Sequence, residues 1–162
     1  MALNAYLTLK GQKQGTIRGS VTQKGRENSI LVHAFSNEIL SPRDPATGLP
    51  TGKRMHKPVV ILKEVDRGSP QLWNAFVSNE DLTTWELKFW ATEVDGTEKQ
   101  IYTISMVNAA IASMREFMLD NEDPANSKLP LREEISFTYQ KIVWTWTDAS
   151  ITATDDWESP VV

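Results

Sequence analysis

The chain of 162 residues contains no cysteine, which excludes disulfide bonds and thiolate metal sites. The fold must therefore hold by packing, in a chain compatible with synthesis in the reducing cytoplasm. Positive charge is also scarce, because 17 Lys and Arg residues stand against 21 Asp and Glu residues and the formal net charge is -4. Without surplus cations or a basic run, nucleic acid is not an expected partner.

Long hydrophobic runs are missing as well. No segment approaches the roughly 20 apolar residues that span a bilayer, so membrane insertion is not expected. The first ten residues lack the basic start and long apolar stretch of a signal peptide. Any export of this chain is therefore expected to proceed without a cleaved signal. The length and the hydrophobic content of 40% fit one domain, 1–162.

Short alternating runs separated by turn residues make up most of the chain, a pattern typical of an all-β sandwich or barrel. The alternation changes phase within 133–147, and such a change marks a bulge or bend in a strand. Strands are predicted at 5–10, 29–40, 57–65, 84–94 and 133–147, with a short last strand and a tail in 151–162.

The dipeptide Asp95-Gly96 follows an alternating run and predicts a hairpin with a type I′ turn, so the next strand should begin near Glu98. The segment 104–118 is ambiguous, because its apolar residues also trace a helical stripe. The preceding turn and the β-favouring residues 101–104 make one long strand the simpler interpretation.

One short helix is predicted at 70–79. Ser69 would be its N-cap and Pro70 its first residue, and an apolar stripe follows at helical spacing. So short a helix is marginal alone and is expected to pack on the barrel wall. Two loops interrupt the strands, at 41–56 and 119–132. The first holds three Pro and two Gly, and loops of its length are usually binding loops or flexible excursions.

The string from Pro42 to Pro58, PRDPATGLPTGKRMHKP, resembles the extended loop of the Hcp (hemolysin-coregulated protein) family of type VI secretion systems. The resemblance extends to Ala5-Tyr6, to the run 69–75, to Tyr139-Gln140-Lys141-Ile142 and to Asp155-Asp156-Trp157. It thus covers nearly the whole chain.

The resemblance implies a small β-barrel of two packed antiparallel sheets with one flanking helix and a long extended loop. It also implies a structural function. Six copies would close into a ring, and rings would stack into a hollow tube that a contractile sheath ejects with a spike at its tip. The implied partners are further copies of this chain, the spike, the sheath and baseplate, and small effectors in the lumen. The protein would assemble in the bacterial cytoplasm and then be secreted.

The loop is a natural stacking element, since its prolines reduce the freedom lost on docking and its charged side chains can bond the next ring. Stacking contacts of this polar kind should loosen with salt before ring contacts do. The predicted interface residues are Pro42, Arg43, Asp44, Pro45, Gly48, Pro50, Gly52, Lys53, Arg54, His56, Lys57, Asp155, Asp156 and Trp157.

Six tryptophans could also suggest a carbohydrate platform. Trp73, Trp85 and Trp144 lie on apolar faces, however, where core packing is the favoured explanation. Trp90 and Trp157 are better candidates for interface surface. The segment Gly48 to Lys53 departs from a Walker A motif in glycine spacing and in the Arg54 that follows, so nucleotide binding is rejected.

No catalytic constellation is found, and neither a cofactor nor a metal is expected. His33 and His56 are the only histidines and lack metal-ligand spacing, and no G-x-S-x-G elbow is present. The adjacent pairs Glu133-Glu134 and Asp155-Asp156 would point to opposite strand faces, which predicts solvated surface charges. Two alternatives to a tube subunit remain: a monomeric β-sandwich that binds a carbohydrate or peptide, and, least favoured, a small hydrolase.

Overall fold

Strands dominate the computed structural model, which describes residues 3–157. One α-helix, α1, spans Ser69–Val77, and two short 3-10 turns span Pro124–Asn126 and Asp148–Ser150. The strands are β1 (Leu3–Gly11), β2 (Gly15–Ile17), β3 (Ile30–Ser36), β4 (Ile39–Leu40), β5 (Met55–His56), β6 (Val59–Glu64), β7 (Leu82–Thr92), β8 (Glu98–Val107), β9 (Ala110–Phe117), β10 (Arg132–Thr138), β11 (Lys141–Trp146) and β12 (Ile151–Asp156).

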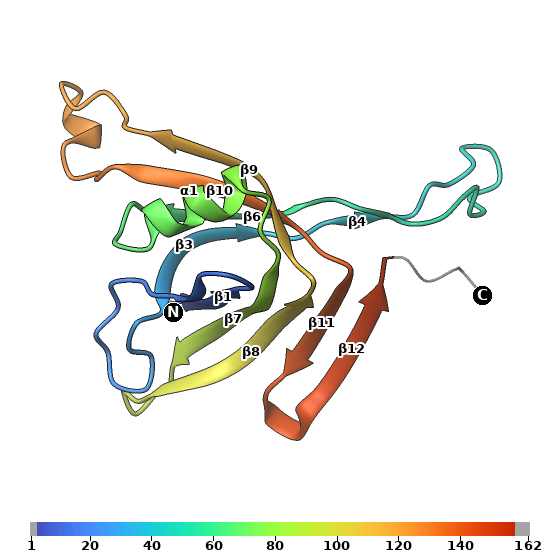
Figure 1. Cartoon of the computed structure of the whole chain (residues 1–162). Coiled ribbons are helices and arrows are strands. Elements are labelled where there is room, and N and C mark those ends of the chain that lie inside the picture. Colours follow the sequence, from blue (N-terminus) through green and yellow to red (C-terminus); the bar gives the residue numbers. More distant parts are fainter. Residues whose placement is uncertain (1–2, 158–162) are drawn as a thin grey trace.

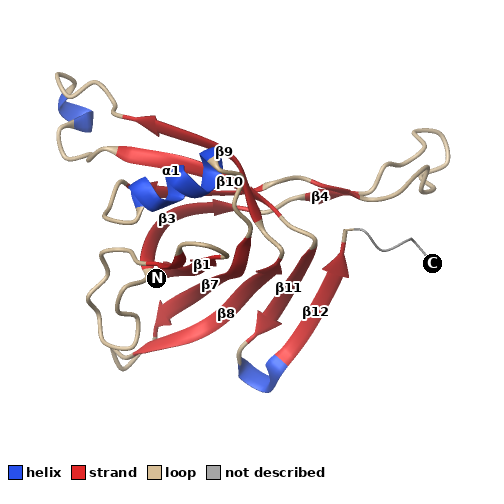
Figure 2. Ribbon diagram, viewed as in Figure 1, coloured by secondary structure: helices blue, strands red, loops and turns tan. Residues whose placement is uncertain are grey.

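Ten of these strands form one antiparallel sheet that curls around the core (Figures 1 and 2). Its order is β12-β11-β8-β7-β1-β3-β6-β10-β9, and β2 adds to β1. Strands β4 and β5 pair separately and form the root of the long loop. The predicted mostly β fold with antiparallel sheets and one helix is confirmed. The two layers are the two halves of one curled sheet, because hydrogen bonding runs through all ten strands.

Two bent segments pass from one half of the sheet to the other. Strand β8 continues into β9 across Asn108, which adopts a positive φ of 51°, and β10 continues into β11 across 139–140. Strand β8 pairs with β11, while β9 pairs with β10. The phase change predicted within 133–147 is therefore real, and it marks a bend between two strands.

The core lies inside the curl and follows the alternation of the strands. Leu7 and Leu9 of β1, Leu87 of β7 and Ile135 of β10 are at most 1% exposed. Trp85, also buried as predicted, meets the Phe137 ring edge-on with centroids 5.5 Å apart. Burying an aromatic or aliphatic side chain of this kind stabilises the fold by about 1.5–3 kcal/mol.

Helix α1 packs near β9 and buries Leu72 and Ala75. The prediction that Ser69 caps this helix is wrong. Gly68 occupies the N-cap position, and Ser69 is the first helical residue. The Ser69 hydroxyl instead donates to the buried Glu133 carboxylate, 2.7 Å away. The Ser69 side chain thus makes a tertiary contact and does not cap the helix.

Two predicted strands and one predicted turn also differ from the structure. The run 29–40 is two strands, β3 and β4, and 104–118 is strand rather than helix but breaks after Val107. At Asp95-Gly96 only Gly96 has a positive φ, so the turn is not type I′. The Asp95 carboxylate accepts a hydrogen bond from the Thr97 amide (2.9 Å), which favours a longer loop, and β8 still begins at Glu98 as expected. Residues 158–162 of the predicted tail lie outside the described part.

Candidate functional site

The extended loop, residues 41–56, projects from the body as a ribbon (Figure 1). Its two sides pair at Leu40 with Met55 and again at Arg43 with Pro50. At the tip the Asp44 carboxylate accepts hydrogen bonds from the Ala46 amide (3.0 Å) and the Thr47 hydroxyl (2.9 Å). Both hydrogen bonds lower the pKa of Asp44, and the bond from the Ala46 amide has the larger effect. The loop therefore has a defined shape before any contact with another molecule.

The root of the loop is fastened to the end of the described chain by the root cluster, which we define as Arg54, His56, Tyr139, Asp155 and Trp157. Arg54 makes a two-pronged contact with the Asp155 carboxylate, both N–O distances being 2.5 Å. Its guanidinium also donates to the Asp156 carbonyl oxygen at 2.9 Å. Bidentate pairs of this kind are strong and geometrically specific. Strand β12 thereby fixes the direction in which the loop leaves the body.

His56 is the centre of the root cluster and is 5% exposed. Its Nε2 lies 2.7 Å from the Asp155 carboxylate and its Nδ1 lies 2.7 Å from the Tyr139 hydroxyl. A carboxylate can only accept, so Nε2–H donates to Asp155 and Nδ1 accepts from Tyr139 in the neutral ring. The Trp157 indole stacks on the imidazole with centroids 5.2 Å apart.

This arrangement shifts the pKa values of three side chains in the root cluster. The hydrogen bond from Arg54 is the largest cause that lowers the pKa of Asp155, and His56 adds to it. The same contact raises the pKa of Arg54. Burial and then the Asp155 charge raise the pKa of Tyr139 to about 12, so its hydroxyl remains protonated and able to donate. These pKa shifts keep Arg54 protonated, Asp155 ionised and Tyr139 neutral, and none of them activates a nucleophile.

The sequence predicted four members of this cluster as interface residues but not that they contact one another. Arg54, His56, Asp155 and Trp157 meet within one chain, and Tyr139 was missed as their partner. Asp156 lies beside them, and its carbonyl binds Arg54. Lys57 pairs with Glu38 at 3.2 Å. The other predicted residues lie along the ribbon: Pro42, Arg43, Asp44, Pro45, Gly48, Pro50, Gly52 and Lys53.

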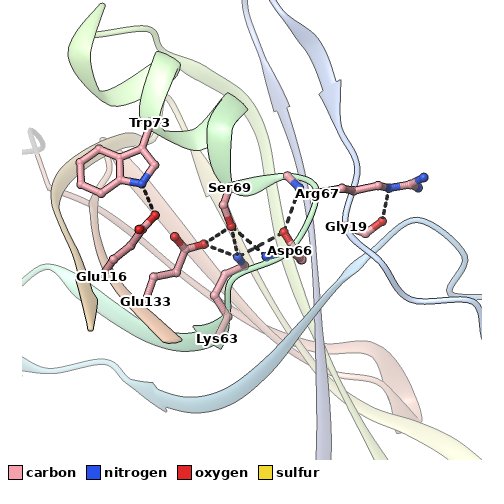
Figure 3. A network of polar contacts seen from close by, with 9 residues as sticks. Gly19, Lys63, Asp66, Arg67, Ser69, Trp73, Glu116 and Glu133 are labelled. Atoms are coloured by element: carbon pink, nitrogen blue, oxygen red, sulfur yellow. Dashed lines mark hydrogen bonds and ion pairs between the residues drawn. The ribbon is translucent and has the colours of Figure 1, made fainter. Parts of the chain in front are cut away.

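The prediction that the two acidic pairs are solvated surface charges is wrong for one member of each pair. Asp155 belongs to the root cluster. Glu133 is 0% exposed and forms an ion pair with Lys63, which is equally buried, in the network of Figure 3. Ser69 bonds both side chains, and Asp66 lies 3.3 Å from the Lys63 ammonium. Strands β6 and β10 place Lys63 and Glu133 directly opposite each other, which a single sequence does not reveal.

The remaining aromatic predictions are met in part. Trp73 is half-buried and its indole donates to Glu116 at 2.5 Å (Figure 3). Trp144 packs at the margin of the core. Trp90, predicted at an interface, lies beneath the Arg26 guanidinium at 4.4 Å.

A depression of about 360 Å³ on the outer side of the sheet includes His33, whose Nε2 lies 3.3 Å from Glu64. Within residues 3–157 no group of three or more metal-ligating side chains is gathered. No helix in the same range is long and apolar enough to cross a membrane.

Comparison with known proteins places this geometry in a family. A family model described as "Type VI secretion system effector, Hcp" matches residues 6–146. The chain belongs to the Hcp family. The "Major exported protein" of Pseudomonas aeruginosa strain PAO1 is 39% identical over 170 aligned positions, which cover 99% of each chain.

Solved Hcp structures share the fold across its length. A crystal structure titled "Hcp protein" superimposes with a TM-score of 0.90 at 26% identity, covering 98% of this chain and 100% of that one. Hcp1 from E. coli of the EAEC 042 pathovar gives 0.85 at 31% identity, with 96% and 99% covered. The secreted protein Hcp3 from Pseudomonas aeruginosa gives 0.79 at 32% identity, with 98% and 100% covered.

Proposed function

We propose that this Hcp protein is the ring-forming subunit of the inner tube of a type VI secretion system. Six copies close into a ring, and the rings stack into a hollow tube that sheath contraction drives out of the cell behind a spike. The lumen carries small effectors. The subunit is assembled in the cytoplasm and is then secreted, and its work is mechanical rather than catalytic.

The observation that carries this proposal is the match to Hcp proteins along nearly the whole chain, including the extended loop. The ordered ribbon of that loop supports it, because a preshaped segment loses less freedom on docking. A relative named as exported supports secretion. The largely buried, internally bonded root cluster gives no support to a hydrolase.

Light scattering coupled to size exclusion tests the proposal. Each chain has a mass of 18.3 kDa, so a closed ring of six is expected at about 110 kDa, with larger stacks at high concentration. A mass of 18.3 kDa at every concentration and salt level would contradict self-assembly.

The loop residues are proposed as contacts between rings. Arg43 is the informative position, because Arg54 already binds Asp155 within its own chain. Arg43→Ala should shorten stacks while rings persist, whereas Arg54→Ala should also loosen the root of the loop. Stack length by electron microscopy at low and high salt measures both effects, and unchanged stacks in Arg43→Ala would contradict the assignment.

A further inference from the structure

The outer depression is the cavity of about 360 Å³ that includes His33, on the side of the sheet that faces away from the core. Its volume lies within the range of small-molecule sites, about 300–1,000 Å³. Strands β1, β3 and β6 form its floor, and the segment 18–29, the blue loop between β2 and β3 in Figure 1, forms one wall. The residues that line it do not include any member of the root cluster.

The wall of the outer depression is fixed by contacts within the chain. Tyr6 lies between two core residues of β1 and so points outward, yet it is only 4% exposed because the segment 18–29 covers it. Its hydroxyl donates to the Gln23 side chain (2.5 Å) and accepts from Arg26 (3.3 Å). Arg26 is in turn paired with Glu98 at 2.5 Å. A cavity that is already shaped loses less freedom when a ligand binds.

The depression combines an apolar part with an acidic edge. Val21 and Leu31 supply the apolar part, and Leu31 is 38% exposed. Glu64 supplies part of the acidic edge, and its side chain is half-exposed. Its Oε1 lies 3.3 Å from Nε2 of His33, so the carboxylate is held by one oxygen at the border of the cavity.

The acidic edge also includes Asp66, whose charge is only partly compensated. Its Oδ1 lies 3.3 Å from the Lys63 ammonium, which leaves Oδ2 available to a ligand. Lys63 is shared with Glu133, so one cation stands against two carboxylates in this network (Figure 3). The neighbouring Arg67 donates instead to a backbone carbonyl of the segment 18–29 at 2.7 Å. Together with Glu64, this arrangement gives the depression a negative field that attracts cations.

We propose that the outer depression binds an organic cation, a guanidinium or ammonium group carried on an aliphatic chain. The cation lies between Glu64 and Asp66, and the chain lies over Val21 and Leu31. Charge-assisted hydrogen bonds to carboxylates are about twice as strong as neutral ones. An aliphatic stem covers apolar surface while its charged head stays at the polar edge. Either a free amine or an arginine or lysine side chain of another protein has this chemistry.

The same geometry disfavours two other classes of ligand. An anion would be repelled by the two carboxylates at the edge of the depression. A carbohydrate would need an open aromatic face on which to stack. The Tyr6 ring does not offer one, because it is buried and the Arg26 guanidinium lies over it at 5.0 Å.

A methyl NMR titration tests the proposal on the full chain, in the oligomeric state that it adopts in solution. The probes are agmatine, a free guanidinium and amine on a four-carbon chain, and the blocked tripeptide Gly-Arg-Gly. Saturable shifts are expected at the methyl groups of Val21 and Leu31, and none at Val94, an exposed residue outside the depression. Tighter binding of the tripeptide supports a protein segment as the source of the cation, and tighter binding of agmatine supports a free amine. No saturable shift with either probe at about 10 mM would overturn the site.

Two comparisons test whether charge carries the recognition. Glu64→Gln should weaken binding of the better probe about tenfold, because it removes one of the two carboxylates. Glu122→Gln is the matched control, since Glu122 is exposed and lies outside the depression, and it should leave the affinity unchanged. Pentanamide, a neutral ligand with a similar chain, should bind about tenfold more weakly than agmatine. Equal binding of pentanamide, or an unchanged affinity in Glu64→Gln, would contradict the proposal.

The outcome is independent of the proposed self-assembly, because all residues of the depression belong to one chain. Rings of normal mass that bind neither probe would overturn the cation site and leave the tube subunit intact. A chain that stays monomeric and yet shows the expected shifts would overturn the tube subunit and leave the cation site intact.

Discussion

Glu133→Gln should strongly destabilise the fold, because it removes one partner of a fully buried ion pair. Lys63 and Glu133 are both 0% exposed and lie between β6, β10 and the start of α1. Breaking such a pair by removing one charge costs about 3–5 kcal/mol, since the other charge is left without compensation in the interior. At about 2–4 °C per kcal/mol for a chain of this size, the melting temperature should fall by roughly 10 °C.

The contacts around Lys63 and Glu133 predict how strongly each of three variants should destabilise the fold. In Glu133→Gln the Lys63 ammonium keeps Asp66 at 3.3 Å, so the cost should lie near the lower end of that range. In Lys63→Met the carboxylate keeps only Ser69, and its Oε2 already lacks a partner among the described residues, so the cost should be larger. The double variant Lys63→Met/Glu133→Leu should cost less than either single change, because no charge remains buried.

Urea unfolding followed by tryptophan fluorescence, at a concentration where all variants have the same oligomeric state, measures these differences. Glu134→Gln is the control, because the Glu134 side chain points to the opposite face of β10 from Glu133. This substitution should change the free energy of unfolding by no more than about 0.5 kcal/mol. If Glu133→Gln cost no more than Glu134→Gln, loss of the Glu133 carboxylate would not leave an uncompensated charge on Lys63 in the interior.

Two further predictions concern the root cluster. Arg54 and His56 lower the pKa of Asp155, so the stability they add is present above the unfolded-state pKa of about 3.9 and is lost as the pH falls through the lower folded value. Urea unfolding of Asp155→Asn should therefore depend less steeply on pH below about pH 4 than wild type does, and parallel curves would contradict this. Tyr139, with a pKa of about 12, should ionise later than an exposed tyrosine in an ultraviolet titration. Tyr139→Phe should remove that late step, and a wild-type titration that is complete near pH 10 would be inconsistent with its burial.

Local patterns predicted most of the fold because strands and turns leave short-range signals. The alternation in 84–94 and the Asp95-Gly96 turn located β7 and the start of β8 within two residues. The strand rather than the helix at 104–118 followed from its neighbours. The bend near Asn108 was not predicted, because it depends on a positive φ and on Gln140 across the strand pair.

The root cluster could be predicted only in part. The family motifs identified Arg54, His56, Asp155 and Trp157, but contacts across about 100 residues of sequence leave no periodic signal. Glu133 was misjudged for the same reason. A Glu that follows or precedes another Glu in the sequence is usually exposed. Only the register of β6 against β10 brings Lys63 opposite Glu133.

The bend at Asn108 affects how the protein unfolds. Because β8 runs into β9 and β10 runs into β11, the same two stretches of chain supply strands to both halves of the curled sheet. The two halves are therefore joined by continuous backbone at both bends as well as by the ladder between β1 and β3. We expect the described part of the chain to open in a single cooperative transition, with no stable half-folded subunit available to enter a growing assembly.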